Sequence, residues 1–312
     1  MENAAEIPNF RPHEDGLETT EPFVLHEPAV HKAPLVFSSP HSGRHYPDHF
    51  LKASRLDQKA LRASEDYFVD RLFSPVVDLG LPLLAATYPR AYVDLNREPY
   101  ELDQRMFADR LPAHVNTRSV RVAGGLGTVA RVVSENREIY ARSLSSAEAL
   151  DRIEHIYRPW HDCLRRLLAR AHVQFGHVVL VDCHSMPSGI KLGKKGSVER
   201  TQRADFILGD RYGTSCTPDI TDEAQIYLKS LGYSVARNKP YAGGFITEHY
   251  GRPAKGLHSL QIEINRALYV DEVTLARNEH YTQLKSDLKG LTQLLMQVSG
   301  DFQQTQVPLA AE

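Results

Sequence analysis

The sequence predicts a three-layer α/β/α sandwich built around a mixed, largely parallel central sheet. Short apolar runs typical of buried strands alternate with amphipathic helical patterns along most of the chain. The run 177–183 (HVVLVDC) is rich in β-branched residues, as a central strand covered on both faces must be. The composition, with 42% hydrophobic and 24% charged residues, is ordinary for a globular chain.

The pattern predicts one catalytic domain over residues 31–300. A chain of 312 residues can bury about three-quarters of its unfolded surface, so folding requires no disulfide or structural metal. Residues 1–30 are acidic and proline-dotted without periodicity, which predicts an N-terminal extension. Residues 301–312 are expected to form a flexible tail.

Composition excludes several classes of protein. The 37 basic and 39 acidic residues give a net charge of −2, which argues against nucleic-acid and anionic-membrane partners because these require a basic surface. No stretch approaches the ~20 apolar residues of a membrane span, and the first ten residues lack the apolar core of a secretory signal. The three cysteines show no C-x-x-C spacing, which favours a reduced compartment and excludes a zinc site built from cysteine. We expect a cytoplasmic protein, monomeric or a small homo-oligomer.

The elements of the first half can be placed in chain order. We expect a strand at 34–39, a helix at 59–73, strands at 83–87 and 91–95, and a glycine-rich loop at 124–127. A long helix follows at 146–174, because apolar residues recur there at three- and four-residue steps. Pro159 should kink this helix or mark a restart, and Gly176 should end it.

The second half repeats the alternation of strands and helices. We expect strands at 206–208, 233–237 and 258–264, and helices at 222–231 and 272–298. The last helix carries its leucines on one face, as a helix packed on a sheet does. A basic, glycine-rich loop spans 189–200, and we consider it and 124–127 as candidate lids.

Two histidines follow predicted strands, and their placement indicates a metal site. His41 lies in S-S-P-H-S-G after strand 34–39, and His184 lies in D-C-H-S after strand 177–183. Open α/β sheets bind ligands at the carboxyl ends of their strands, so imidazoles on neighbouring strands converge there. A lone histidine after a strand is usually a hydrogen-bonded loop residue, whereas two flanked by small residues favour ligation of zinc.

A catalytic zinc site of this type needs a third ligand, and an acid is expected. Glu65 and Asp66 are adjacent in S-E-D at the start of a predicted helix, and both are candidates. Acids in the first turn of a helix also stabilise its dipole without any further role. The residues alone leave open whether either of them binds the metal.

Glu263 is the candidate general base. In Q-I-E-I-N-R the side chains alternate, so Glu263 and Gln261 share a face if Ile262 and Ile264 point into the core. A carboxylate at the end of a buried strand needs a partner or a function. Accepting a proton from a metal-activated water is one such function, and a salt bridge to a nearby arginine is the alternative.

Arginines at the same edge of the sheet predict an anionic ligand. Asn96 and Arg97 follow a predicted strand in D-L-N-R, and a guanidinium there pairs bidentately with a carboxylate. Arg266 is the second candidate for this contact. Gly243 and Gly244 form a loop whose backbone can approach a ligand closely.

Six segments in order resemble the N-formylglutamate amidohydrolase family over about residues 34–269. They are SSPHSGRHYP, SEDYFVDRLF, VDLNREP, DCHSMP, NKPYAGGFITEHYG and SLQIEINRALY. The resemblance implies the phosphorylase/hydrolase-like fold shared with zinc carboxypeptidases. It also implies hydrolysis of N-formyl amides of acidic amino acids, the last step of one histidine-degradation route.

The resemblance implies roles for individual residues. His41, Asp66 and His184 would bind Zn²⁺, with Glu65 as the alternative acid, and Glu263 would be the base. The implied substrate-binding residues are Asn96, Arg97, Gly243, Gly244, Thr247 and His249, with Arg266 as second choice for the substrate carboxylate.

The chain departs from these patterns at two positions. Zinc carboxypeptidases take ligands from H-x-x-E, but Arg44 lies three residues after His41, so the acid must come from elsewhere. Glu248 precedes His249 where the family pattern has arginine, and a reversed charge in the pocket would change which carboxylate fits.

We therefore expect a zinc-dependent amidohydrolase acting on a small anionic N-acyl amino acid. A metallopeptidase or aminoacylase of the same fold is one alternative, and a metal-free anion-binding module is another. A serine hydrolase is disfavoured because neither Ser42 nor Ser185 lies in a G-x-S-x-G turn.

Overall fold

A seven-stranded mixed sheet forms the centre of the molecule. The computed structural model describes residues 20–133, 137–192, 198–200 and 204–305. The strand order is β1-β3-β2-β6-β11-β9-β10. The strands are β1 (Phe23–His26), β2 (Leu35–Ser39), β3 (Leu83–Ala86), β6 (Val178–Met186), β9 (Phe206–Gly209), β10 (Val235–Arg237) and β11 (Leu257–Asn265). The four central strands β3, β2, β6 and β11 are parallel to one another. β1 pairs antiparallel with β3, and β9 pairs antiparallel with β11 but parallel with β10.

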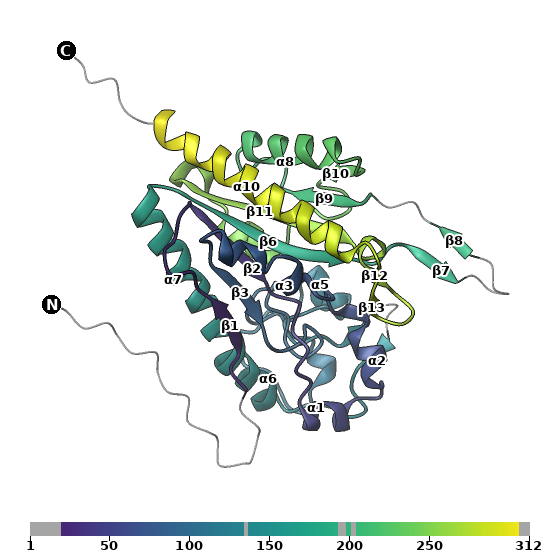
Figure 1. Cartoon of the computed structure of the whole chain (residues 1–312). Coiled ribbons are helices and arrows are strands. Elements are labelled where there is room, and N and C mark those ends of the chain that lie inside the picture. Colours follow the sequence, from purple (N-terminus) through teal and green to yellow (C-terminus); the bar gives the residue numbers. More distant parts are fainter. Residues whose placement is uncertain (1–19, 134–136, 193–197, 201–203, 306–312) are drawn as a thin grey trace.

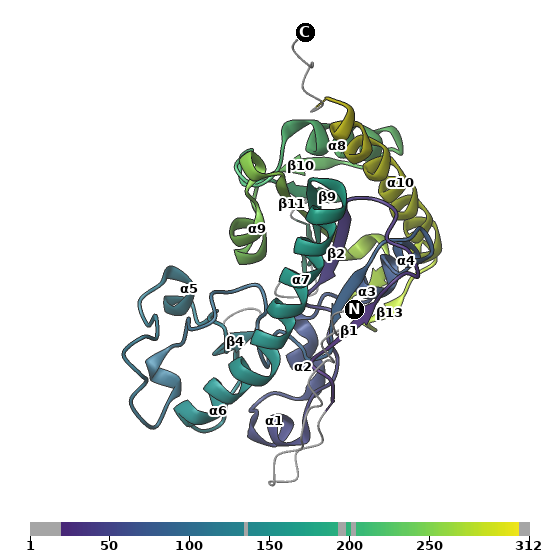
Figure 2. The ribbon, with the colours of Figure 1, turned by 90° about the vertical axis from the view of Figure 1, so that its left-hand side faces the viewer.

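Helices cover both faces of the sheet, as the predicted sandwich requires. One face carries α6 (Ser146–Arg152), α7 (Arg158–Phe175) and α9 (Phe245–Tyr250). The other carries α3 (Val69–Leu72), α4 (Pro75–Asp78), α8 (Pro218–Ser230) and α10 (Tyr281–Thr305). Figures 1 and 2 show α7 and α10 on opposite sides of the strands. The expected three-layer architecture is therefore confirmed.

Alternation along the central strands decides which side chains can form a site. On β6, Val179 and Val181 pack in the core under α10, whereas Val178 and Leu180 pack in the core under α7. Because side chains alternate along a strand, His184 lies on the α7 side. The same period holds on β11, where Ile262 and Ile264 lie in the core under α10 and leave Gln261 and Glu263 on the α7 side.

Short elements complete the fold around one end of the sheet. They are α1 (Asp48–Ala53), α2 (Gln58–Leu61), α5 (Val120–Ala123) and the strand pairs β4 (Val132–Val133) with β5 (Arg137–Glu138), β7 (Ile190–Leu192) with β8 (Val198–Arg200), and β12 (Val270–Asp271) with β13 (Ala276–Arg277). Figure 2 shows α1, α5 and α6 gathered in a lobe beside the sheet. No helix in the described residues is long and apolar enough to span a bilayer.

Two of the expected elements in the first half are wrong. The helix expected at 59–73 is divided into α2, a 3-10 turn at 62–64 and α3, with 65–68 between them. Phe68 in this break has a left-handed backbone (φ 55°), so the helix cannot continue through it. The strand expected at 91–95 is a turn, because the amides of Tyr92 and Val93 donate to the carbonyl of Pro89 instead of to a neighbouring strand.

The long central helix restarts at the proline, as expected. A single π turn (Ile153–Tyr157) separates α6 from α7, and Pro159 occupies the first turn of α7. Gly176 ends α7 in a left-handed conformation (φ 77°). The last helix begins at Tyr281 instead of 272, because β12 and β13 pair as a short ribbon before it.

The expected ends of the domain need correction. Phe23–His26 of the predicted extension form β1, which pairs with β3 and belongs to the sheet. At the other end α10 continues to Thr305, into the predicted tail. The basic loop at 189–200 contains β7 and β8, and its residues 193–197, which include Lys194 and Lys195, lie outside the described part of the chain.

The free energy of unfolding is expected to fall in mild acid because of His161. This side chain lies between α7 and α9, with Nδ1 2.9 Å from the Tyr250 hydroxyl, and burial lowers its pKa to about 3. Between that value and about 6.5 the unfolded chain binds more protons, so stability is complete above pH 6.5 and decreases as the pH falls.

Lowering the pH from 7.5 to 5.0 should therefore cost about 2 kcal/mol through His161 alone, at 1.36 kcal/mol per pH unit below pH 6.5. Urea unfolding of the wild type and of His161→Phe at both pH values isolates this contribution, because the variant lacks it. An identical pH dependence in the two proteins would contradict the assignment.

Candidate active site

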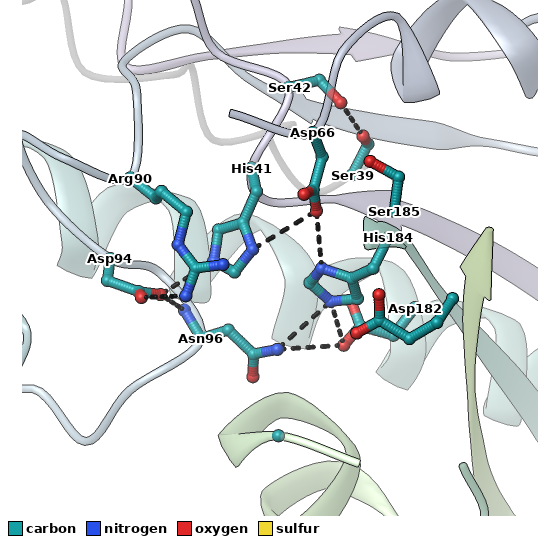
Figure 3. A network of polar contacts seen from close by, with 12 residues as sticks. Ser39, His41, Ser42, Asp66, Arg90, Asp94, Asn96, Asp182, His184 and Ser185 are labelled. Atoms are coloured by element: carbon teal, nitrogen blue, oxygen red, sulfur yellow. Dashed lines mark hydrogen bonds and ion pairs between the residues drawn. The ribbon is translucent and has the colours of Figure 1, made fainter. Parts of the chain in front are cut away.

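His41 and His184 meet at the carboxyl ends of two adjacent parallel strands. His184 lies near the end of β6, and His41 lies just after β2, which pairs with β6. Although 143 positions separate them in sequence, their ring centroids are 4.8 Å apart. Figure 3 shows both rings facing the carboxylate of Asp66.

The turn after β2 brings Asp66 to the same point. The amide of Asp66 donates to the carbonyl of His41 (3.0 Å), and the hydroxyl of Ser42 accepts from the amide of Asp70 (3.1 Å). Glycine at 43 lets the same turn pass close to the segment after β3, where a Cβ would lie 2.0 Å from the Tyr88 carbonyl oxygen. The hydrogen bonds of His41 and Ser42 therefore hold the break at 65–68 and the start of α3 against the end of β2.

His41, Asp66 and His184 form a compact group of possible metal ligands. Asp66 Oδ2 lies 3.5 Å from His41 Nδ1 and 3.0 Å from His184 Nδ1. All three side chains are buried, and their ligand atoms lie within 4.8 Å of one another. Donors about 2.0 Å from one tetrahedral ion are about 3.3 Å apart, so these two separations suit a shared cation.

Carboxylates hold the other nitrogen of each imidazole. His41 Nε2 lies 2.8 Å from Asp94 Oδ1, and His184 Nε2 lies 2.9 Å from Asp182 Oδ2 (Figure 3). The same oxygen of Asp182 also accepts from Asn96 Nδ2 (3.4 Å). Histidines that bind metals almost always donate their second ring N–H in this way, which fixes the ring and directs the free nitrogen to the ion.

The polar groups present fit a divalent cation. His41 Nδ1 is buried without a hydrogen-bond partner, although it faces Asp66. Burial alone would lower the pKa of His184, but the surrounding Asp182, Asp66 and Glu263 raise it well above its usual value. The carboxylates around the two imidazoles thus favour positive charge at this point, which a bound cation could supply. Two nitrogens and one oxygen accept several divalent ions, zinc among them.

The two adjacent acids point in different directions. Glu65 is bound by Arg62 Nε (2.8 Å) and by the Tyr46 hydroxyl (3.2 Å), away from the imidazoles. Asp66 faces the imidazoles, and its second oxygen accepts from Arg266 Nη2 (3.3 Å). Because a break and not a helix carries these residues, neighbouring side chains can diverge as they do here.

Glu263 lies on the wall of the cavity beside this group. The cavity has a volume of about 230 Å³. It is lined by His41, Arg90, Asn96, Arg97, Arg121, His184, Pro240, Tyr241, Ala242, Gly243, Gly244, Gln261 and Glu263. Burial raises the pKa of Glu263 to about 7, although His184 opposes the shift. Gln261 Nε2 donates to Glu263 Oε1 (2.9 Å) and orients its carboxylate.

Three arginines give this cavity a positive wall. Arg97 was expected there, whereas Arg90, between the predicted strands 83–87 and 91–95, and Arg121 were missed. Arg90 Nη2 donates to Asp94 (2.7 Å), and Arg97 Nε donates to the carbonyl of Leu126 in the predicted loop 124–127. Arg121 Nη1 has a more distant partner, Glu101, at 3.8 Å.

The double-glycine loop closes one side of the cavity. The amide of Gly244 donates to Gln261 Oε1 (2.8 Å), and a Cβ at Gly244 would lie 2.4 Å from Asn96 Nδ2. Asn96 Oδ1 accepts from the amide of Ile246 (2.7 Å), so both ends of this amide are engaged by protein groups. Thr247 is buried beneath the loop and bonded to Gln261, not among the cavity-lining residues.

Other implied substrate-binding residues lie outside this cavity. His249 is exposed and stacks on Phe245 with 4.9 Å between centroids. Glu248 is 55% exposed and pairs with Arg211 (2.9 Å), so its negative charge does not line the cavity. Arg266 is buried, and its contacts to Asp66 and to the Ser185 hydroxyl show that it supports a possible ligand.

A second cavity of about 370 Å³ adjoins the first. The two share Arg90, Arg97, Tyr241 and Glu263. The second also has an apolar wall, formed by Ala91, Leu126, Ala130, Val132, Val133 and Met186. The site therefore has a polar chamber beside the histidines and a larger, partly apolar chamber that reaches Glu263 from another side.

Comparison with known proteins identifies relatives over most of the chain. The model of the N-formylglutamate amidohydrolase family matches residues 33–270. An N-formylglutamate deformylase from Pseudomonas putida is 30% identical over 268 residues, which cover 85% of this chain and 90% of the relative. A second N-formylglutamate deformylase, from Pseudomonas aeruginosa, is 28% identical over 244 residues, covering 77% and 84% of the two chains.

A solved structure shares the fold. The crystal structure of N-formylglutamate amidohydrolase from Ralstonia eutropha superposes with a TM-score of 0.81 at 37% identity, covering 92% of this chain and 100% of the other. The family match covers well over half of the residues, and the shared sheet with its flanking helices agrees with it. The chain belongs to the N-formylglutamate amidohydrolase family.

Proposed function

We propose that this protein is a metal-dependent amidohydrolase that cleaves N-formyl-L-glutamate or a related N-acyl acidic amino acid. The observation that carries the proposal is the convergence of His41 Nδ1, His184 Nδ1 and Asp66 Oδ2 beside an arginine-lined cavity. The names of the Pseudomonas relatives support the substrate class.

The metal and Glu263 divide the chemical work. A divalent ion such as Zn²⁺, held by His41, Asp66 and His184, would polarise the amide carbonyl and lower the pKa of water. Glu263 would accept a proton from the attacking water and pass it to the nitrogen of the leaving amine. Its pKa of about 7 suits both transfers near neutral pH, because the group can gain and lose a proton at similar cost. The products are formate and glutamate.

The arginines support recognition of an acidic amino acid. Arg97 and Arg121 line the same cavity as Glu263, and N-formylglutamate carries two carboxylates. A guanidinium binds a carboxylate bidentately, which fixes both the position and the rotation of the substrate. Gly243 and Gly244 line the same cavity and have no side chains to fill it, which leaves room for the substrate main chain.

Removal and return of the metal test the proposal. Protein treated with a chelator should no longer hydrolyse N-formyl-L-glutamate, and addition of one equivalent of Zn²⁺ should restore this activity. The release of formate measures hydrolysis in both cases. Thermal unfolding in the same series should show a higher Tm with metal, because binding to the native state alone stabilises it. Full activity in protein shown by elemental analysis to be metal-free would refute the proposal.

Replacing Glu65 and Asp66 one at a time should show which of the two acids binds the metal and which has a structural role. Asp66→Asn should lose most bound metal and most activity, because an amide is a far weaker ligand than a carboxylate. Glu65→Gln should lower the Tm, because Arg62 and Tyr46 lose a buried charged partner, but should bind one equivalent of metal. Metal content by elemental analysis distinguishes them, and the reverse pattern would assign the ligand to Glu65.

Arg121→Ala should weaken substrate binding more than chemistry. We expect KM for N-formylglutamate to rise about 10- to 100-fold, the loss of a charge-assisted contact worth about 1.5–3 kcal/mol, with a smaller change in kcat. Arg118→Ala is the matched control, since Arg118 is an exposed arginine just before α5, the short helix that carries Arg121, and does not line the cavity. Equal KM values in both variants would remove Arg121 from substrate binding.

The second cavity favours one alternative substrate class. Its apolar wall lies beside Glu263, and a formyl group carries no carbon chain to occupy it. An aminoacylase that removes larger acyl groups from acidic amino acids would use this space. Comparing kcat/KM for N-formyl-, N-acetyl- and N-hexanoylglutamate decides between them, because the aminoacylase assignment requires the hexanoyl substrate to be preferred.

A further inference from the structure

The segment 90–97 orients both imidazoles of the metal group without belonging to any strand or helix. Asp94 binds His41, Asn96 Nδ2 donates to Asp182, the carboxylate that binds His184, and Arg90 and Arg97 line the cavity. The segment consists of turns, so no ladder of backbone hydrogen bonds fixes its shape. Groups placed on irregular backbone need support from outside to hold a precise geometry.

Three side chains from one helical face supply that support. Arg152 Nη1 donates to the carbonyl of Tyr92 (3.2 Å), His161 Nε2 lies 2.9 Å from the carbonyl of Leu95, and the Tyr157 hydroxyl donates to the carbonyl of Arg97 (2.6 Å). These carbonyls alternate with Asp94 and Asn96 along the segment. We name Arg152, Tyr157 and His161 the carbonyl-binding row.

Each member of the row is itself held in place. All three side chains are buried. The guanidinium of Arg152 lies 4.0 Å above the ring of Tyr92 and also donates to the Tyr140 hydroxyl (2.7 Å). His161 is a neutral imidazole, since burial lowers its pKa to about 3, and the Tyr250 hydroxyl at 2.9 Å from Nδ1 leaves Nε2–H as the donor to Leu95.

The π turn between α6 and α7 puts the row in line. The amide of Arg158 donates to the carbonyl of Ile153, five residues earlier, so this turn contains one more residue than an α-turn. In a continuous α-helix, Arg152 and Tyr157 would be about 140° apart around the axis, since each residue turns by about 100°. The wider turn returns both to one face, and His161 follows four residues later in α7.

From these contacts we infer that Arg152, Tyr157 and His161 are positioning residues for the active site. By binding three carbonyls of segment 90–97, they fix Asp94, which binds His41, and Asn96, which binds Asp182 and through it orients His184 toward the metal position. The inference deepens the proposed function, on which its metal-related part rests. The restraint of the segment itself is independent of any metal.

The Tyr157→Phe variant tests the row with the smallest change, because it removes one hydroxyl and keeps the ring. Tyr233→Phe is the matched control: its hydroxyl donates to Asp287 at 2.6 Å, on the α10 side of the sheet and away from the site. Both variants should lose stability by similar amounts. Only a positioning role predicts further effects on segment 90–97 and on metal affinity.

Two measurements on the full-length proteins separate the outcomes. Hydrogen exchange in metal-free protein should be faster across peptides covering 90–97 in Tyr157→Phe but unchanged there in Tyr233→Phe. Calorimetric titration with Zn²⁺ should give a dissociation constant about tenfold higher in Tyr157→Phe, at the lower end of losses for groups that orient metal ligands. In the double variant with Asp94→Asn, Tyr157→Phe should raise the zinc dissociation constant by a smaller factor than it does alone, because both substitutions act on His41.

Each result supports or overturns a defined part of the inference. Unchanged hydrogen exchange at 90–97 would contradict the claim that the carbonyl-binding row restrains this segment. Faster exchange with unchanged zinc affinity would overturn its role in the active site. A wild-type protein that binds no divalent ion would refute the proposed function while leaving the exchange experiment as the test of the row.

Discussion

His184→Ala should bind little or no metal and should lose hydrolysis of N-formylglutamate by a factor on the order of 10³ or more. The substitution removes one of two nitrogen ligands and leaves Asp66 and Asp182 without their shared partner. A site that loses a ligand binds its ion weakly, and both carbonyl polarisation and water activation are lost with the ion. Elemental analysis and a formate-release assay measure the two effects.

The control for this variant is His280→Ala. His280 is 70% exposed, pairs with Glu279 and does not line the cavity. It should retain one equivalent of metal and wild-type activity. Circular dichroism should show that His184→Ala is folded at the assay temperature. A folded His184→Ala protein that retained both its metal and wild-type turnover would contradict the assignment of this histidine.

Glu263→Gln should keep its metal but lose about 10²- to 10⁴-fold in kcat, the usual contribution of a general base. Glutamine has the shape of glutamate but cannot accept and return a proton. Glu263 contacts none of the proposed ligands through a hydrogen bond, and its Oε1 accepts from Gln261, a contact that an amide oxygen preserves. The site should therefore remain assembled in the variant.

Steady-state kinetics together with metal analysis test this expectation. KM should change much less than kcat, because the substrate carboxylates are assigned to the arginines and not to Glu263. Unchanged kcat in a metal-loaded variant would exclude Glu263 as the base. Loss of the metal would instead mean that Glu263 helps to hold the ion.

The strands that carry the site could be predicted because burial leaves a strong pattern. β2 and β6 were expected from their apolar runs. The positions of His41 and His184 could be predicted because each histidine comes directly after one of these runs. On β11 the apolar residues Ile262 and Ile264 assign Glu263 to the other face, and the structure confirms this alternation. A period of two along a strand is a local property, so sequence reveals it.

The break that carries Asp66 could not be predicted in the same way. Residues 59–73 have a helical pattern, but the left-handed Phe68 and the hydrogen bond from Asp66 to the His41 carbonyl depend on the turn after β2. These contacts join residues far apart in sequence. The resemblance to a family, not periodicity, singled out Asp66 over Glu65.

The segment 90–97 shows the same limit. Val93 and Leu95 alternate with polar residues as in a strand, yet both are buried against helices in a turn-rich conformation. Asn96 was expected to bind substrate; it lines the cavity, and its amide also bonds Asp182 and Ile246, which the sequence did not indicate. The roles of these polar side chains depend on tertiary partners that no local pattern contains.

Anomalous diffraction from crystals grown with Zn²⁺ is the most direct test of the site. We predict one strong peak at the zinc edge, about 2.0–2.2 Å from His41 Nδ1, His184 Nδ1 and one oxygen of Asp66. Asp94 and Asp182 should remain bonded to the opposite ring nitrogens. Crystals of active protein with no anomalous peak between the two imidazoles, or with the ion bound elsewhere, would contradict the proposed metal site.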